Sequence, residues 1–483
     1  MRSPASICGR SVRSPAISGP RPSRTPTRAP DLPLRRRNFP LKSFVPALGG
    51  TIAALALSFS LSFASVGTAE AVDIQTVTSP GGIKALLVED HTNPLIAMNF
   101  AFKGGGSTQD EPGKEGTANL MSGLLDEGAG DIDSQEFQAR LDDLGVSLSY
   151  DASLDNFSGS FRTITEVNDD AFALLKASIN DPRFDEEPVA RIRGQIMAGI
   201  LAEQNDPGEL AGKAFSRTVF ADHPYARPTD GTLETLETVT AADLKAFRTR
   251  IFAQDNLYVG VVGDITPDEL GKRLDEVFGA LPETPELKPV ADIQPVLGKT
   301  EAVDLAVPQT TIQMALPGVM RDDDEFFAAY LMNHILGGGS FTSRLYEEIR
   351  EKRGLAYGAG SFLASYDHAA VLGISTATRA EKAEESIAII REQLADLAEN
   401  GPTAEELAKA KAYVKGAYAI RNLDSSAAIA STLLGIQLDD LGIDYIDRRQ
   451  DLIDAVTLDD VKAQARALLS APPTIITVGP AGA

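Results

Sequence analysis

The hydrophobic pattern divides the chain into β-branched apolar segments and longer stretches with a helical period. Segments such as Leu257–Gly263 and Thr474–Gly479 are rich in valine, isoleucine or threonine, which is typical of strands. Residues 403–420 have the helical period instead, and Thr403 followed by Glu406 is a capping-box pattern. Within each half of the chain strands come first, long helices follow and a strand ends the half. This order predicts an α+β fold, in which each antiparallel sheet has helices on one face.

The same order of elements occurs twice, so we predict two homologous domains. Met98 and Met314 lie in two strand-like segments and are 216 residues apart. Gly263 and Gly479, at the ends of two later strand-like segments, have the same spacing. A period this long is too large for a solenoid repeat and indicates duplication of a whole domain.

Helical segments repeat at a similar distance. Residues 239–246 (VTAADLKA) recur 217 positions later as residues 456–463 (VTLDDVKA), each with a threonine N-cap and an aspartate three residues on. Residues 119–128 and 330–337 share the order of a Leu-Met pair, two further apolar residues and a glycine, at an offset near 211. The first of these helices is expected to continue to Gly128.

The boundary between the domains is predicted from proline content. Residues 281–300 hold Pro282, Pro285, Pro289 and Pro295 without a helical period, which indicates an extended linker. The predicted parts are therefore a leader over residues 1–71, a first domain over 72–281, a linker over 282–300 and a second domain over 301–483.

The amino-terminal segment is predicted to be an export signal. Arg35, Arg36 and Arg37 precede the apolar run 45–66, and Ala69-Glu70-Ala71 supplies the small residues that a signal peptidase needs, so cleavage is expected after Ala71. A transmembrane anchor is the alternative, because the run is long enough to span a bilayer. Its glycines and serines favour export. The protein is therefore expected to be periplasmic or otherwise exported, and membrane association after cleavage is not expected.

Composition excludes several kinds of site. Without residues 1–71 the chain has 35 basic and 66 acidic residues, a net formal charge of −31, which disfavours nucleic acid and anionic lipid as partners. The single cysteine, Cys8, lies in the leader, so disulfides and thiolate catalysis are excluded. The four histidines are too scattered for a histidine-rich metal site: His91, His223, His334 and His368.

Residues 116–125 (GTANLMSGLL) resemble the zinc-binding helix of insulinase/pitrilysin-type peptidases, the inverzincins. That helix carries H-x-x-E-H, because residues four apart share one helix face and can both bind zinc, while the glutamate serves as general base. Here the three positions hold Asn119, Ser122 and Gly123. An amide, a hydroxyl and a bare backbone do not replace two imidazoles and a carboxylate.

The resemblance also implies a third zinc ligand, a glutamate about 75 residues further on and eight before a proline. Counting back from Pro207 leads to Gly199, which has no side chain. The carboxylates that follow the helix, Asp126 and Glu127, are expected to be solvated. We therefore expect no zinc in this chain.

A second segment carries the complementary part of the resemblance. Residues 336–357 resemble the region of the family's C-terminal domain in which an arginine and a tyrosine seven residues later contact the substrate peptide, so the pair here is Arg350 and Tyr357. A helix from Ser340 is expected to end at Gly354, before a strand. On it Phe341, Leu345 and Ile349 would share one buried face.

Arg350 and Tyr357 have two possible roles, one in substrate binding and one that is purely structural. A guanidinium and a phenol can both donate hydrogen bonds to a peptide carbonyl or a developing oxyanion. The alternative is an Arg350 paired with Glu347 or another neighbouring carboxylate and a Tyr357 half-buried in the sheet. The spacing carried by the resemblance favours substrate contact.

Other candidate residues favour structural roles. The glycines 337–339 are not followed by the Gly-Lys-Ser/Thr of a phosphate loop, and glycines 104–106 are expected in a hairpin or loop. His334 on an apolar helix is expected to be a core residue, since no G-x-S-x-G nucleophile accompanies it. His223 is expected to be structural.

The resemblance implies a division of labour between two chains. Small bacterial members of the family have two homologous domains that form half of a clamshell, and one chain brings zinc while the other brings the Arg/Tyr pair. This chain is then the non-catalytic subunit of a heterodimeric zinc metallopeptidase acting on peptides, with zinc in a homologous H-x-x-E-H partner. The alternatives are an inactive structural or peptide-binding scaffold, and a self-sufficient enzyme of other chemistry, for which the sequence offers no nucleophile, metal cluster or cofactor loop.

Overall fold

The structure is a computed structural model that describes residues 73–482. The leader, its cleavage site and Cys8 lie outside the described residues, so the predictions made for them remain predictions. The described residues belong to one compact unit.

The first sheet has six strands in the order β1-β2-β6-β3-β5-β4. Neighbouring strands are antiparallel except β2 and β6, which are parallel. The strands are β1 (Gln75–Thr78), β2 (Lys84–Glu89), β3 (Leu95–Lys103), β4 (Ser147–Ala152), β5 (Asn156–Ile164) and β6 (Leu257–Gly263).

The second sheet has five strands in the order β7-β11-β8-β10-β9. Only β7 and β11 run parallel. The strands are β7 (Thr300–Asp304), β8 (Gln309–Pro317), β9 (Ala356–Ser365), β10 (Ala370–Arg379) and β11 (Thr474–Gly479). This order repeats that of the first sheet without β1, so the two sheets have the same topology, as the duplicated sequence predicted.

Fifteen α-helices are assigned within the described residues. In the first half they are α1 (Thr117–Ser122), α2 (Ser134–Leu144), α3 (Asn168–Asn180), α4 (Glu186–Glu203), α5 (Pro207–Phe220), α6 (Leu233–Thr238), α7 (Ala241–Ile251) and α8 (Pro267–Phe278). In the second half they are α9 (Phe326–Asn333), α10 (Arg344–Tyr346), α11 (Ala383–Asn400), α12 (Ala404–Asn422), α13 (Ser426–Leu438), α14 (Tyr445–Ala455) and α15 (Leu458–Leu469).

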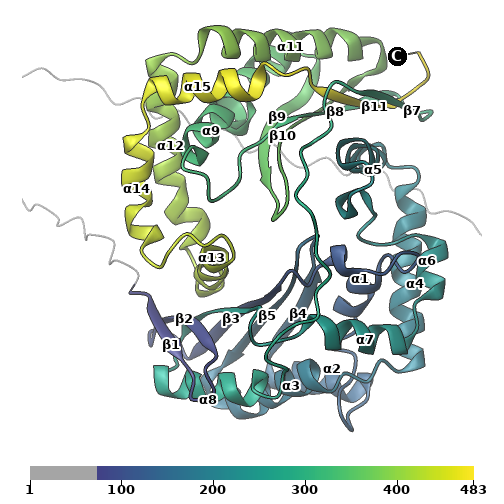
Figure 1. Ribbon diagram of the computed structural model, residues 1–483, viewed down its shortest axis with the longest axis vertical. Coiled ribbons are helices and arrows are strands. Elements are labelled where there is room, and N and C mark those ends of the chain that lie inside the picture. The colour runs from purple at the N-terminus through teal and green to yellow at the C-terminus, as the bar shows by residue number, and fades with distance from the viewer. Residues whose placement is uncertain (1–72, 483) are drawn as a thin grey trace, which may run out of the picture. The chain divides into compact units, whose positions relative to one another are not determined.

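Helices pack on one face of each sheet and form a separate core there. Figure 1 shows α3 and α8 beneath the first sheet, where Phe100, Phe161 and Phe172 are buried. On the second sheet α9, α11 and α15 cover the corresponding face, around Met314 and Ile390. This arrangement confirms the predicted α+β fold.

The opposite face of each sheet is covered by a helix from the other half. Helix α13 packs against β3 and β6 of the first sheet, and α5 packs against β8 and β11 of the second. A Cβ atom at Gly260 on β6 would lie 2.6 Å from the carbonyl oxygen of Ala430 and 2.9 Å from Cβ of Leu433, so the glycine permits the close approach of α13. The two halves therefore share their hydrophobic packing.

Most local predictions are confirmed. The four strand-like segments lie in β3, β6, β8 and β11, and the three predicted capping boxes are present, at Thr240/Asp243, Thr403/Glu406 and Thr457/Asp460. Glycines 104–106 lie in the loop after β3. Residues 282–299 contain no helix or strand, but their backbone is hydrogen-bonded to both halves, for example from Val296 to Val219 and from Ile293 to His368.

Two predicted helices are wrong in extent. Helix α1 ends at Ser122 instead of continuing toward Gly128, and Gly123 caps it. Glycine is a poor helix former, so the chain leaves the helix there in a tight turn. The expected helix 340–354 is broken, because Ser340 has a φ of 49° and Ser343 is extended.

Within residues 340–354 a 3-10 turn is followed by α10 and by a π-helical turn, Glu347–Glu351. Leu345 and Ile349 are fully buried, as predicted. Phe341, predicted to share their buried face, is 73% exposed, since it lies before the extended residue Ser343 and outside the helical register.

Among residues 73–482, no helix combines the length and the apolar character that a membrane span requires.

Candidate functional site

The helix that resembles a zinc-binding element is α1, and it lies beside α4 and α7. Asp110 caps its amino-terminal end: the carboxylate oxygens accept hydrogen bonds from the backbone N–H groups of Gly116 at 2.8 Å and Ala118 at 3.0 Å. Leu120 and Met121 are buried in the first core. The helix is thus held in place by a capped amino-terminal end and by buried apolar side chains.

The side chains at those positions are already engaged with other protein groups. Asn119 donates from Nδ2 to Oδ1 of Asp230 at 2.8 Å. The Ser122 hydroxyl donates to the carbonyl oxygen of Asn119 at 2.8 Å, within the helix. A Cβ atom at Gly123 would lie 2.9 Å from a methyl carbon of Ile192 on α4.

The fourth position, Gly199, lies on the exposed side of α4 with open space around it. Zinc is held by imidazole, thiolate or carboxylate groups. None of the four residues supplies one, so this donor set does not fit a zinc ion. Within residues 73–482, no group of three or more histidine, cysteine, aspartate or glutamate side chains is placed to hold a metal.

The carboxylates near α1 are tied to structural partners. Glu127 is buried, pairs with Arg191 at 2.6 Å and accepts a hydrogen bond from Ser134. Burial raises the pKa of Asp126, whose carboxylate accepts a hydrogen bond from Gln138. The expectation that both carboxylates are solvated was wrong, because the short helix turns them back into the fold.

Arg350 and Tyr357 lie on either side of one turn. Arg350 is in the π-helical turn Glu347–Glu351, and Tyr357 is the second residue of β9. Gly354, with a φ of 59°, reverses the chain between them, and its N–H donates to the carbonyl oxygen of Arg350 at 3.0 Å. The turn ties the end of the helical segment to the start of the edge strand.

Tyr357 is 86% exposed, so it is not half-buried in the sheet. The ladder between β9 and β10 is irregular beside it, since Ala359 pairs with Thr376 but Ala356 pairs with Thr378. The hydroxyl of Thr376 donates to the carbonyl oxygen of Gly358 on β9 at 2.8 Å, and that of Thr378 donates to the carbonyl oxygen of Leu355, just before β9, at 2.7 Å. A bulge of this kind re-aims a side chain at a sheet edge.

The guanidinium of Arg350 lies over aromatic rings and has only a long contact with a carboxylate. Its guanidinium carbon is 4.8 Å from the centre of the Tyr346 ring and 5.9 Å from that of the exposed Phe341. The nearest acidic contact is a long one, 3.8 Å to Glu351. Glu347, the partner expected in the structural alternative, pairs with Lys352 instead.

Two histidines were expected to be structural. His223 is buried and bonds through Nε2 to the carbonyl oxygen of Ala291 in the linker at 2.7 Å. His334 is only half-buried, and its ring is tilted against that of Tyr413, with the ring centres 5.0 Å apart. The expectation of a core position for His334 was wrong, because the side chain lines a pocket.

Family comparisons agree with this geometry. Residues 85–233 match the family described as insulinase (peptidase family M16), and residues 238–414 match the peptidase M16 inactive domain. A solved peptidase M16 inactive domain from Pseudomonas fluorescens is 30% identical, with a TM-score of 0.79 over 85% of this chain and 98% of that chain. A Helicobacter pylori structure described as a protease has a TM-score of 0.76 at 20% identity, over 84% of this chain and 99% of that chain, and supports the fold.

Curated relatives include proteins described as peptidases and as non-peptidases. An uncharacterized zinc protease of Streptomyces coelicolor is 26% identical over 84% of this chain and 90% of the relative. The non-peptidase homolog YmxG of Helicobacter pylori is 27% identical over 72% of this chain and 81% of the relative.

The fold and the altered helix define a duplicated α+β protein of the metallopeptidase class whose own zinc positions lack ligands. The chain belongs to the insulinase (peptidase M16) family.

Proposed function

We propose that this chain is the non-catalytic, substrate-binding subunit of a two-chain zinc metallopeptidase that acts on peptides. The observation that carries the proposal is that the metal-site positions lack zinc ligands while Arg350 and Tyr357 remain accessible to a substrate. Asn119, Ser122 and Gly123 offer no zinc ligand, while Tyr357 stands almost fully exposed at the start of an edge strand. A homologous subunit with an intact H-x-x-E-H helix would supply the metal and the catalytic base.

Arg350 and Tyr357 would hold the substrate backbone. A guanidinium stacked on Tyr346 is positioned by that ring without losing its hydrogen-bond donors to a tight ion pair. The exposed phenol of Tyr357 has its donor available to a bound peptide. Both groups suit a peptide carbonyl, which accepts hydrogen bonds.

The names of relatives support a role without peptidase activity of its own. One relative is called a non-peptidase homolog, and the solved structure at 30% identity is called an inactive domain. Neither name describes a partner. The heterodimer is therefore inferred from what the family resemblance implies.

We place the working protein outside the cytoplasm. The support is the arginine-led apolar run 45–66 and the small residues up to Ala71 in the sequence. Cell fractionation with amino-terminal sequencing of the purified protein tests this. A protein found in the cytoplasm with Arg35–Arg37 still attached would contradict it.

The function is tested by reconstitution. The purified chain is mixed with the H-x-x-E-H homologue of the same genome, and hydrolysis of fluorogenic peptides is followed for each chain and for the mixture. We expect no hydrolysis by this chain alone and activity in the mixture. Arg350→Ala combined with Tyr357→Phe should lower kcat/KM by about 10- to 100-fold, the effect of about one to two charge-assisted hydrogen bonds.

Arg353→Ala is the matched control, because Arg353 lies on the same turn but donates to Glu348. It should leave kcat/KM of the complex unchanged. Full activity in the Arg350/Tyr357 double variant would remove the substrate-binding role. A chain that forms no active complex with the homologue would favour the scaffold alternative, and peptide hydrolysis by the isolated chain would overturn the proposal.

A further inference from the structure

The sequence repeat relates the lost zinc site to a second place in the fold. At the offset of 211 that relates α1 to α9, the positions of Asn119, Ser122 and Gly123 correspond to Tyr330, Asn333 and His334. Helix α9 packs beside α15 as α1 packs beside α7. The second half thus contains a structural counterpart of the degenerate helix.

The fourth zinc position has a counterpart too. Asp185 and Thr403, the N-cap residues of α4 and α12, are 218 positions apart. The same offset relates Gly199 to Ala417 on α12. Helix α12 contacts α9 and the π-helical turn that follows it, as α4 contacts α1.

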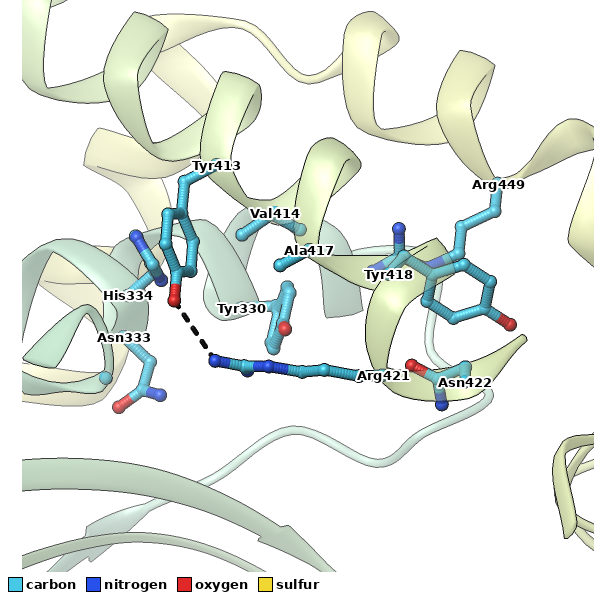
Figure 2. Close-up of a pocket in the computed structure, with 11 residues that line it drawn as sticks. Tyr330, Asn333, His334, Tyr413, Val414, Ala417, Tyr418, Arg421, Asn422 and Arg449 are labelled. Carbon is cyan, nitrogen blue, oxygen red and sulfur yellow. Dashed lines mark hydrogen bonds between the residues drawn. The ribbon is translucent and has the colours of Figure 1, made fainter. Parts of the chain in front are cut away.

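These four counterparts line one pocket of about 150 Å³, shown in Figure 2. The figure shows His334 and Asn333 on one side, Tyr418 and Arg449 on the other, and Arg421 extended between them. The remaining lining residues are Gly338, Tyr413, Val414 and Asn422. None of the lining residues is acidic, although the chain as a whole has a net charge of −23.

Arg449 on α14 is the unusual member of this pocket. The residue is only 6% exposed, and its Nη1 atom is buried without a hydrogen-bond partner among the described residues. Its guanidinium carbon lies 4.0 Å from the centre of the Tyr418 ring and 5.9 Å from that of Phe327. A buried guanidinium nitrogen without a hydrogen-bond partner has a free-energy cost that a bound anion would remove.

A second cation faces the same space. Arg421, near the end of α12, donates a 3.0 Å hydrogen bond to the hydroxyl of Tyr413 and also lines the pocket. Burial, together with the charge of Arg421, lowers the pKa of His334. Two guanidinium groups therefore line one small pocket, and no carboxylate in its lining balances their charge.

The other walls combine apolar and aromatic side chains with the amides of Asn333 and Asn422. Val414 and Ala417 come from α12, and Tyr330 from α9. A ligand with a charged head and a small carbon body matches this combination better than a fully hydrated ion. A carboxylate is planar and singly charged, and it can take two parallel hydrogen bonds from one guanidinium.

We propose that this pocket binds a carboxylate group, presented either by a small organic acid or by the carboxyl terminus of a peptide. Arg449 holds the carboxylate, and Arg421 closes over it from the solvent side. The pocket occupies in the second half the place that the zinc site occupies in catalytic family members. This binding site does not include Arg350 or Tyr357, so its test is separate from the test of the proposed function.

The test is a binding measurement on the purified protein without any partner. Calorimetric titrations use acetate, inorganic phosphate, a short peptide with a free carboxyl terminus and the same peptide amidated. We expect acetate and the free-acid peptide to bind and the amidated peptide to bind at least tenfold more weakly. Tighter binding of the peptide identifies a peptide terminus as the source, and equal binding identifies a small acid.

Variants locate the site. Arg449→Met keeps most of the side-chain volume and should weaken carboxylate binding at least tenfold, while Arg421→Gln should weaken it several-fold. Arg448→Gln is the matched control, since Arg448 pairs with Asp444 and does not line the pocket. A bound carboxylate should also raise the pKa of His334 in an NMR titration of the four histidines and leave that of the exposed His91 unchanged.

Three results would overturn the proposal: no binding of any carboxylate, phosphate bound at least tenfold more tightly than every carboxylate, or unchanged binding by Arg449→Met. The last would leave Arg449 as a ring-stacked structural residue. If Arg449→Met does not fold, Arg421→Gln and the amidated peptide decide, and wild-type binding in both cases refutes the site.

Discussion

The phenol of Tyr225 donates a 2.6 Å hydrogen bond to Oδ1 of Asp155, and this contact lies at the junction of the two halves of the protein. The other carboxylate oxygen of Asp155 accepts from the backbone of Asp367 at 3.1 Å. The N–H of His368 donates to the Tyr225 hydroxyl at 3.0 Å. The loop before β5 and the hairpin between β9 and β10 are thereby joined through one buried tyrosine.

Tyr225→Phe should destabilise the protein by about 1–3 kcal/mol, because it removes a donor from a buried carboxylate and an acceptor from a backbone N–H. Equilibrium unfolding in urea, at constant m-value, measures this. Tyr357→Phe is the matched control: the phenol is exposed, so a change within about 0.5 kcal/mol is expected. Equal stability of both variants would show that the junction does not depend on the Tyr225 hydroxyl.

The packing of α13 on β6 gives a second pair of variants. Gly260→Ala places a methyl group 2.6 Å from the Ala430 carbonyl oxygen and should cost about 1–3 kcal/mol through overpacking. Gly435→Ala, within α13, meets nothing within 4 Å and should stabilise by about 0.5–1 kcal/mol. Thermal unfolding of the two variants should therefore shift in opposite directions. A neutral Gly260→Ala would mean that α13 can move away from the sheet without loss.

The raised pKa of Asp110 predicts how the free energy of unfolding depends on pH. Burial raises the pKa of its carboxyl from the ordinary 3.8 to about 7, despite the hydrogen bonds from Gly116 and Ala118 that favour the charged form. Between those two values the folded protein binds a proton that the unfolded chain has released. The contribution of Asp110 to stability is therefore largest at low pH and is lost as the pH rises toward about 7, by at most about 1.4 kcal/mol per pH unit.

Unfolding free energies measured from pH 4.5 to 7.5 test this sign. Subtracting the curve of Asp110→Asn from that of the wild type should isolate a stability that declines with pH. Asp142→Asn, at an exposed position, should leave the wild-type slope intact. A difference curve that rises with pH would show that the two backbone hydrogen bonds outweigh burial.

The sequence predicted the repeated fold well because its cues are local. Met98 and Met314 occupy equivalent central strands, and the capping threonines begin their helices. Such features depend on residues close in the chain. The break within 340–354 was missed, because apolar spacing does not show that Ser340 adopts a positive φ.

The candidate site was predicted in part. The resemblance to the family indicated the missing zinc ligands and the positions of Arg350 and Tyr357. The exchange of α5 and α13 between the sheets could not be predicted, since an apolar helix does not specify which sheet it covers. Arg449 lies in a run of charged residues that predicts a solvated face. Its burial depends on contact with Tyr418, which the sequence alone does not show.

The metal content of the isolated protein is the remaining prediction. A metal that binds the folded protein adds its binding free energy to stability, so removal of a bound zinc by a chelator lowers the melting temperature. Asn119 is bonded to Asp230, Ser122 to its own helix, and Gly199 faces open space, so we expect substoichiometric zinc by elemental analysis and the same melting temperature with and without EDTA. The H-x-x-E-H homologue, measured in parallel, should hold one zinc and lose it. One zinc retained per chain here, and lost in Asn119→Ala, would show that this helix binds metal after all.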